Sequence, residues 1–316
     1  MFIIYKMGKD RLIVITGATA TGKTDLAIEL AEKINGEIIS ADAMMVYKYM
    51  DIGTAKPSKD IREKIPHYLI DVVEPSDYFS VKEFIHLAQK YIKDIQNKGK
   101  IPIIVGGTWL YIQGLLYGLS DAPEGDFKIR EELYKKESNE LYEELKKVDL
   151  EYANKIHKND KKRIIRALEV FYISGKPFSY FQKKHSFKEK KYEFLGFVLE
   201  RNKDEIMDRI EKRVEMMFSQ GLVDEVKFLI DMGYKNFLTS SQAIGYKELI
   251  PYFDGKISLK KAKEDIIKNT KKFAKRQIRT FRSKFINKNG WSFINLSTKN
   301  FDIYLTNKIK IFSNKN

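Results

Sequence analysis

Cysteine is absent from this sequence of 316 residues, which excludes disulfide frameworks, thiolate metal sites and cysteine nucleophiles. Proline is also scarce, at 7 residues, so no proline-rich linker is expected. No stretch approaches the roughly 18 consecutive apolar residues that a membrane-spanning helix needs. Together these absences predict a soluble protein of the cytoplasm that does not insert into a membrane.

Positive charge is abundant and unevenly distributed. The chain has 58 Lys and Arg residues against 43 Asp and Glu residues, a net charge of +15. Between residues 256 and 291 there are 13 basic residues and two acidic ones, a local charge of +11. Apolar residues recur there at steps of three and four, which predicts an amphipathic helix over 258–286 with a basic outer face. A solvated surface helix or a membrane-surface helix also fits, but a nucleic-acid partner explains the concentration of charge better.

The order of the hydrophobic segments predicts an α/β fold. Hydrophobic residues make up 43% of the chain, enough for a sizeable core. We expect buried strands at 12–16, 37–41, 68–73, 101–105 and 194–199, alternating with helices, which implies a P-loop NTPase or kinase-like parallel sheet flanked by helices. The chain between 127 and 175 has a helical, charged pattern throughout. We therefore assign 121–193 to an all-helical insertion, 1–120 and 194–291 to a discontinuous α/β core, and 292–316 to a C-terminal tail.

A phosphate-binding loop lies between the first expected strand and the helix after it. Its glycines allow the backbone to wrap around an anion, the helix N-terminus offers free N–H groups, and Lys23 adds positive charge. Thr24 is placed to ligate Mg²⁺. The loop predicts that a di- or triphosphate binds, without indicating what is transferred. The residues that fit the pattern G-x-x-x-x-G-K-[ST] are Gly17, Ala18, Thr19, Ala20, Thr21, Gly22, Lys23 and Thr24.

Carboxylates follow two of the expected strands. Asp42 comes after the strand at 37–41, and the carboxyl ends of parallel strands open on the side where ligands bind. Asp42 is therefore a candidate general base or Mg²⁺ ligand, although a turn or helix-cap role suits its position equally well. Asp71 has a weaker claim of the same kind. The strand at 101–105 runs into Gly106-Gly107-Thr108 rather than the Asp typical of motor ATPases, which argues against an ATPase.

An ordered series of motifs follows the phosphate loop. Its segments are 40–57 (SADAMMVYKYMDIGTAKP), 106–111 (GGTWLY), Asn159-Asp160 with Arg163, 166–170 (RALEV), Arg209-Ile210 with Arg213, 243–248 (AIGYKE) and 274–277 (AKRQ). The series resembles the tRNA dimethylallyltransferases, bacterial enzymes that prenylate an adenosine beside the anticodon. The resemblance runs from about residue 11 to about residue 291 and so covers nearly the whole chain.

The resemblance implies transfer of a dimethylallyl group from dimethylallyl diphosphate to N6 of the adenosine 3′-adjacent to the anticodon. The chemistry of the phosphate loop predicts Mg²⁺ as the cofactor, and we expect a monomer. It implies that Asp42 takes the N6 proton, and that Lys23 and Arg213 stabilise the leaving diphosphate. It places a further set of residues against the anticodon stem-loop of tRNA: Asp42, Ala43, Met44, Met45, Thr108, Arg130, Lys162, Arg163, Ile164, Ile165, Arg166, Lys275, Arg276, Gln277, Arg279 and Arg282.

The sequence departs from the family pattern at three places, and the first two concern hydrogen bonds to the target base or its neighbours. Ala43 and Met45 stand where the family usually has Ser and Gln, and Arg279-Thr280-Phe281 stands where a Trp is common. Three alternative functions remain open: a P-loop kinase of small molecules or nucleosides, an isopentenyltransferase that acts on free AMP, and an RNA-binding protein that senses a nucleotide. The first two leave the charge of 256–291 unexplained.

Overall fold

The computed structural model describes residues 11–184, 190–237, 239–285, 289–299 and 301–313. The chain divides into two compact units: unit 1 contains residues 1–116 and 192–316, and unit 2 contains 117–191. Among the described residues, no helix combines the length and the apolarity needed to cross a bilayer.

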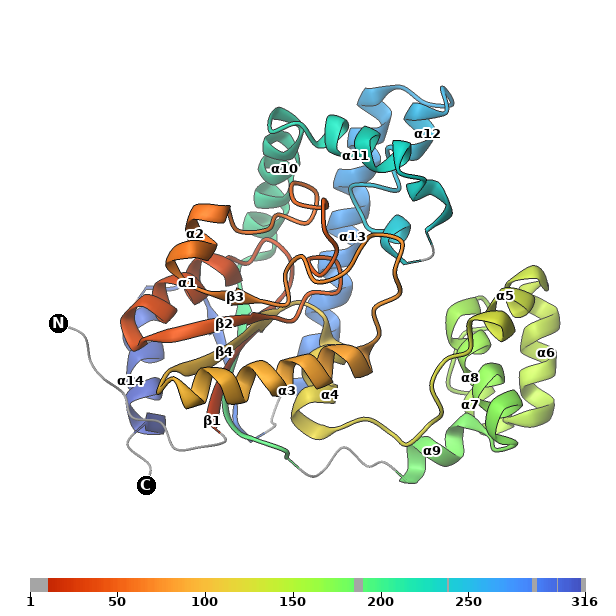
Figure 1. Cartoon of the computed structure of the whole chain (residues 1–316), viewed down its shortest axis with the longest axis horizontal. Helices are drawn as coiled ribbons and strands as arrows, with labels where there is room; N and C mark the ends of the chain where they lie inside the picture. The colour runs from red at the N-terminus through yellow and green to blue at the C-terminus, as the bar shows by residue number, and fades with distance from the viewer. Residues whose placement is uncertain (1–10, 185–189, 238, 286–288, 300, 314–316) are drawn as a thin grey trace. The chain divides into compact units, whose positions relative to one another are not determined.

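Unit 1 is built on one six-stranded sheet in which every described pairing is parallel, in the order β3-β2-β4-β1-β5-β6. Figure 1 labels β1, β2, β3 and β4 of this sheet. Four strands, β1, β2, β4 and β5, are buried at nearly every position. Such strands need helices on both faces of the sheet. The strand bounds are β1 (Arg11–Gly17), β2 (Gly36–Ser40), β3 (His67–Tyr68), β4 (Ile101–Gly106), β5 (Glu193–Glu200) and β6 (Trp291–Asn295).

Helices pack on both faces of this sheet. Helices α1 (Lys23–Ile34) and α14 (Phe301–Ser313) share a hydrophobic cluster with alternate strand residues such as Ile13 and Phe197. The intervening strand residues, such as Val14, point to the opposite face of the sheet and are buried too. Helices α3 (Val81–Asn97) and α13 (Leu259–Phe285) also pack on the strands. The other elements of unit 1 are α2 (Lys59–Lys64), α4 (Trp109–Tyr117), α10 (Lys203–Ser219), α11 (Leu222–Asp231), α12 (Ile250–Phe253) and the 3₁₀ turns Tyr234–Asn236 and Ser240–Gln242.

Unit 2 is helical throughout its described residues. Its core is formed by leucine, isoleucine, alanine and tyrosine side chains from α5 to α8. An ion-pair cluster surrounds the fully buried carboxylate of Glu169, which binds both Arg130 and Arg166 at 2.7 and 2.5 Å. The helices are α5 (Phe127–Lys135), α6 (Ser138–Val148), α7 (Leu150–Ala153), α8 (Lys161–Ser174) and α9 (Phe178–Lys184).

The predicted fold class is confirmed, and two predicted elements are wrong. The strand expected at 68–73 covers only His67–Tyr68, because Leu69 and Asp71 have left-handed backbone with φ of 62° and 57°. The segment 292–316, predicted to be a tail, contributes β6 and α14 to the α/β core. The basic helix expected at 258–286 is α13; its last expected residue, Ile286, lies outside the described residues.

We expect Ile309→Ala to lower the free energy of unfolding of unit 1 by about 2–5 kcal/mol, because it leaves a cavity in the shared cluster. Ile309 is 1% exposed, whereas Ile311 in the same helix is 60% exposed. Ile311→Ala is therefore the matched control and should change the stability by at most about 0.5 kcal/mol. Urea denaturation followed by tryptophan fluorescence reports on unit 1, because both tryptophans, Trp109 and Trp291, belong to it. Equal stabilities of the two variants would show that α14 is dispensable for the core.

Candidate active site

The phosphate loop closes on itself at the carboxyl end of β1. The hydroxyl of Thr21 and the ammonium of Lys23 both donate to the carbonyl of Ala18, at 2.8 and 2.7 Å. Gly22, the residue before α1, has a left-handed φ of 96°, which only glycine adopts without a steric penalty. The loop therefore enters the helix in the geometry that turns backbone N–H groups toward an anion.

Three long side chains hold this loop from outside. Arg201 donates to the carbonyl of Thr21 at 2.7 Å, and Arg209 donates to the carbonyl of Ala20 at 2.9 Å. The Gln277 side chain, on the buried face of α13, accepts the N–H of Thr19 at 2.8 Å and donates to the carbonyl of Gly107 at 3.1 Å. These bonds join the phosphate loop to β5, α10, α13 and the end of β4.

A cavity of about 100 Å³ opens beside the loop. Lys23 and Thr24 line it from the start of α1, Asp42 and Met45 from the segment after β2, and Arg213 from α10. A larger cavity of about 640 Å³ shares Lys23, Thr24 and Arg213 with the first. The structure thus brings together the three predicted catalytic residues, Asp42, Lys23 and Arg213, with the predicted Mg²⁺ ligand.

The two cations in the cavity are poorly compensated. Burial, together with the charge of Arg213, lowers the pKa of Lys23 to about 8, although Asp42 opposes the shift. Burial also lowers the pKa of Arg213, against the opposing influence of Asp42 and Asp25. Desolvated cations of this kind favour binding of an anion that restores the missing negative charge. The cavity is therefore suited to a diphosphate.

Asp42 caps a turn and also lines the cavity. Its Oδ1 accepts the N–H of Met44 at 2.9 Å, which forms a turn directly after β2. The same carboxylate lines the cavity. The hydroxyl oxygen of Thr108 accepts the N–H of the preceding residue, Ala43, at 3.0 Å. Hydrogen bonds from two consecutive amides therefore fix the orientation of this segment.

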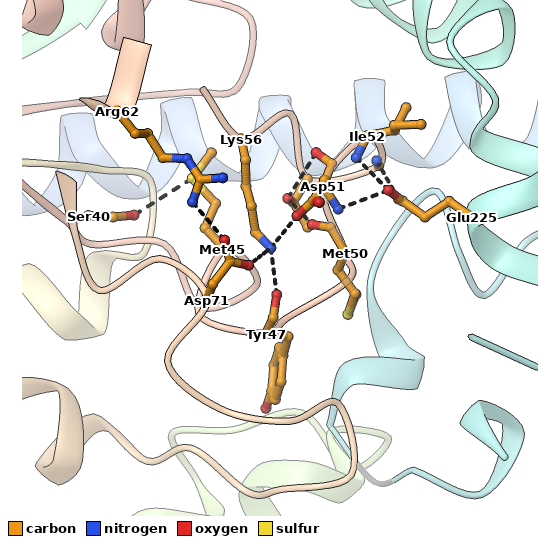
Figure 2. Close-up of polar contacts among 12 residues, drawn as sticks. Ser40, Met45, Tyr47, Met50, Asp51, Ile52, Lys56, Arg62, Asp71 and Glu225 are labelled. Carbon is orange, nitrogen blue, oxygen red and sulfur yellow. Dashed lines mark hydrogen bonds and ion pairs between the residues drawn. The ribbon is translucent and has the colours of Figure 1, made fainter. Parts of the chain in front are cut away.

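Asp71, the weaker candidate, is a structural ion-pair partner. Its two carboxylate oxygens accept from Lys56 at 2.5 Å and from Arg62 at 2.7 Å (Figure 2). Burial alone would raise the pKa of Asp71, but these hydrogen bonds hold it below the ordinary value. Both oxygens are thereby engaged by cations, and Asp71 does not line either cavity described above.

The predicted tRNA-binding residues of α13 divide between its two faces. Lys275, Arg276 and Arg279 are exposed, whereas Gln277 is only 8% exposed and binds the phosphate loop. Arg282 is exposed and donates to Glu200 at 2.7 Å. The Gln277 side chain therefore holds the loop instead of facing outward with its neighbours.

The predicted tRNA-binding residues of unit 2 also divide. Lys162 and Arg163 are exposed. The side chains of Ile164 and Ile165 are 0% and 2% exposed within the hydrophobic core of the unit, so the prediction that they contact RNA is wrong for their side chains. The helical period explains the correction, because consecutive residues of α8 cannot all face outward.

Sequence reasoning missed two residues that shape the site. Arg201 directly follows β5, beside β1, and that position at the carboxyl end of a neighbouring strand was the signal for it. Glu225 accepts the N–H groups of Asp51, Ile52 and Gly53. No motif surrounds Glu225, and only the tertiary structure shows its partners.

The sequence is similar to those of known proteins. The IPP transferase family model matches residues 45–284. The tRNA dimethylallyltransferase of Sulfurihydrogenibium sp. (strain YO3AOP1) is 67% identical over 273 residues, which cover 86% of this chain and 89% of that protein. The tRNA dimethylallyltransferase of Aquifex aeolicus (strain VF5) is 51% identical over 310 residues, which cover 97% and 99% of the two chains.

Solved structures extend the likeness to the fold. The tRNA delta(2)-isopentenylpyrophosphate transferase of Staphylococcus epidermidis superposes with a TM-score of 0.70 at 41% identity, over 97% of this chain and 100% of that one. A eukaryotic dimethylallyltransferase acting on tRNA superposes with a TM-score of 0.83 at 31% identity, over 98% and 81% of the two chains. Likeness of this extent, in sequence and in fold, means that the chain belongs to the IPP transferase family of tRNA dimethylallyltransferases.

Proposed function

We propose that this enzyme transfers the dimethylallyl group of dimethylallyl diphosphate to N6 of the adenosine 3′-adjacent to the anticodon of tRNA, and releases diphosphate. The observation that carries the proposal is the cavity in which Asp42 lies with the desolvated cations Lys23 and Arg213. A base and an anion site on one cavity suit the joining of an amine to a carbon that bears a diphosphate. Relatives that are 67% and 51% identical in sequence carry the name of this activity.

The chemistry requires one bond to form as another breaks. The N6 lone pair attacks C1 of the dimethylallyl group, the bond from C1 to the diphosphate oxygen breaks, and Asp42 accepts the N6 proton. Negative charge that develops on the leaving diphosphate is stabilised by Lys23, Arg213 and the amides of the phosphate loop. Because these cations are desolvated before the donor binds, their interaction with the diphosphate is stronger than it would be in water.

Mg²⁺ is the cofactor that fits the donor atoms. Thr24 lines both cavities, and Mg²⁺ in phosphate-transfer sites prefers a few protein oxygens together with phosphate oxygens. When bound, Mg²⁺ would neutralise part of the charge of the diphosphate. Thr24 would hold it in this proposal, and Lys23 would bind the same diphosphate from the protein side.

The exposed cations of α13 support the proposal of a tRNA substrate. Lys275, Arg276 and Arg279 lie on the outer face of the helix whose inner residue, Gln277, holds the phosphate loop. Phosphate contacts by such side chains supply most of the sequence-independent affinity for RNA. The adenine would leave the stacked anticodon loop to reach the cavity, at a cost of a few kcal/mol. We expect a monomer acting in the cytoplasm.

The direct test is to incubate the enzyme with Mg²⁺, an unmodified anticodon stem-loop and either dimethylallyl diphosphate or ATP, and to weigh the RNA. We expect a C₅H₈ increment on the adenosine 3′ to the anticodon, with dimethylallyl diphosphate only. Asp42→Asn should reduce kcat by about 10²–10⁴-fold and leave the affinity for the RNA nearly unchanged. Equal loss of turnover and RNA affinity would contradict the role of Asp42 as base. Turnover of ATP, or transfer to free AMP without transfer to RNA, would assign a kinase or a nucleotide prenyltransferase instead.

The protonation of Lys23 predicts how donor binding depends on pH. At a pKa of about 8, half of the Lys23 side chains are neutral at that pH, and a bound diphosphate favours the charged form. Donor binding should therefore take up a proton, and the affinity should fall as the pH rises above about 8, by up to tenfold per pH unit. Calorimetry without RNA, in two buffers of different ionisation enthalpy, measures this uptake; Lys23→Gln should abolish it. A wild-type Kd that stays constant from about pH 7 to 9.5 would contradict the shifted pKa.

The proposed RNA contacts predict a change in salt dependence. Lys275→Ala combined with Arg276→Ala should weaken tRNA binding and reduce the slope of log K against log salt by up to about 1.4–1.8, since each lost phosphate contact removes about 0.7–0.9. Lys308→Ala with Lys310→Ala removes the same charge from α14 and is the matched control. Filter binding across a salt series measures both slopes. Identical slopes for the two double variants would exclude this face of α13 as the RNA contact.

A further inference from the structure

The side chain of Glu225 binds three consecutive amides of the segment after β2. Glu225 lies in the first turn of α11. Its Oε2 accepts the N–H groups of Asp51 and Ile52 at 3.0 and 2.8 Å, and its Oε1 accepts the N–H of Gly53 at 3.1 Å (Figure 2). The hydroxyl of Tyr246 donates to the same Oε1 at 2.6 Å. Hydrogen bonds to a carboxylate are about twice as strong as neutral ones, so this one side chain is a firm attachment point.

The other end of the segment is held by a buried ammonium. The side chain of Lys56 is 1% exposed, and its nitrogen donates to the carbonyl of Tyr47 at 2.6 Å, to Asp51 at 2.7 Å and to Asp71 at 2.5 Å (Figure 2). Residues 51–57 are therefore fixed between a carboxylate on α11 and an ammonium of their own, and we call these residues the clamped loop.

The clamped loop and its approach include unfavourable backbone conformations. Tyr49 and Ala55 have left-handed φ values of 62° and 54°, which cost of order 1–3 kcal/mol each for residues other than glycine. Gly53 leaves no room for a side chain, because a Cβ there would lie 2.3 Å from the ring of Tyr246. Such conformations persist only where surrounding contacts enforce them, and the bonds to Glu225 are among those contacts.

The clamped loop reaches the proposed reaction centre through Thr54. The carbonyl of Thr54 accepts from the guanidinium of Arg213 at 3.4 Å. Thr54, Ala55 and Pro57 line the cavity together with Asp42. The loop therefore forms part of the wall of the cavity and contacts the Arg213 side chain.

We propose that Glu225 is a positioning residue for Arg213, acting through the clamped loop. This inference rests on the proposed function, because Arg213 is the group that stabilises the leaving diphosphate. Glu225 itself touches neither substrate: it holds the amides of Asp51 to Gly53, and the loop then presents the Thr54 carbonyl to the guanidinium. Loss of the carboxylate should impair use of the diphosphate donor and leave RNA binding unaffected.

The test is Glu225→Gln. The glutamine amide has the shape of the carboxylate but lacks its charge. Its NH₂ group must also face backbone N–H groups that one of the carboxylate oxygens accepts in the wild type. We expect kcat/KM for dimethylallyl diphosphate to fall by about 10- to 100-fold, as misplacement of a catalytic group by about 1 Å does, with the KM for RNA unchanged. Asp224→Asn is the matched control, because it removes an exposed carboxylate from the same helical turn and should behave as wild type.

A double-mutant cycle separates positioning from a general effect on structure. In an Arg213→Lys background, Glu225→Gln should have almost no further effect on donor kinetics, because the group that it positions is already lost. Additive losses, or a Glu225→Gln variant with wild-type kinetics, would overturn the proposal. Tyr246→Phe removes only one of the four donors and should give a smaller loss of the same kind, which keeps the test available if Glu225→Gln fails to fold.

The proposed function and this inference fail in different ways. If the wild-type enzyme adds no dimethylallyl group to RNA, the proposed function is wrong. Calorimetry of inorganic diphosphate binding then still tests the role of Glu225 in holding the clamped loop. Glu225→Gln should weaken the binding of diphosphate, and Asp224→Asn should not. Equal diphosphate affinities of these two variants would overturn the positioning role independently of the reaction.

Discussion

The side-chain amide of Gln277 holds together the loops on which the cavity depends. It joins the amide of Thr19 in the phosphate loop to the carbonyl of Gly107 after β4. Glycine is required at position 106, because a Cβ there would lie 2.1 Å from the carbonyl oxygen of Ala41 directly after β2. A Cβ at Gly107 would lie 2.6 Å from the Gln277 amide nitrogen and would displace that side chain. The ends of β1, β2 and β4 can therefore lie close enough to share one cavity.

The two faces of helix α13 consequently differ in what they contact. Its inner face contributes Gln277 to the phosphate loop and Phe281 to the core. Its outer face carries Lys275, Arg276 and Arg279. The helical period places these residues on opposite sides although they are adjacent in sequence. The groups proposed to bind RNA are thus connected rigidly, through one helix, to the loop proposed to bind the diphosphate.

Much of the site could be predicted because its signals are local. The phosphate loop has a fixed spacing, and Asp42 ends a hydrophobic strand, so both were found without tertiary information. Asp71 ends a similar run, but two positive φ values and the cations Lys56 and Arg62 make it a structural residue. Glu225 lay beyond prediction because its partners are 172 to 174 positions away in the chain. The packing of α14 was likewise invisible, since its pattern does not show which face of the sheet it covers.

The division of the chain into units has a consequence for biosynthesis. Unit 2 is one continuous segment, residues 117–191, whereas unit 1 is interrupted by it. During translation unit 2 can complete its core as soon as its own helices have emerged, because domains fold as units in the order of synthesis. The sheet of unit 1 must wait for β5 and β6, and the face covered by α1 stays open until α14 has been made. The hydrophobic side chains of β1 and β4 that pack against α14 can therefore be covered only at the end of synthesis.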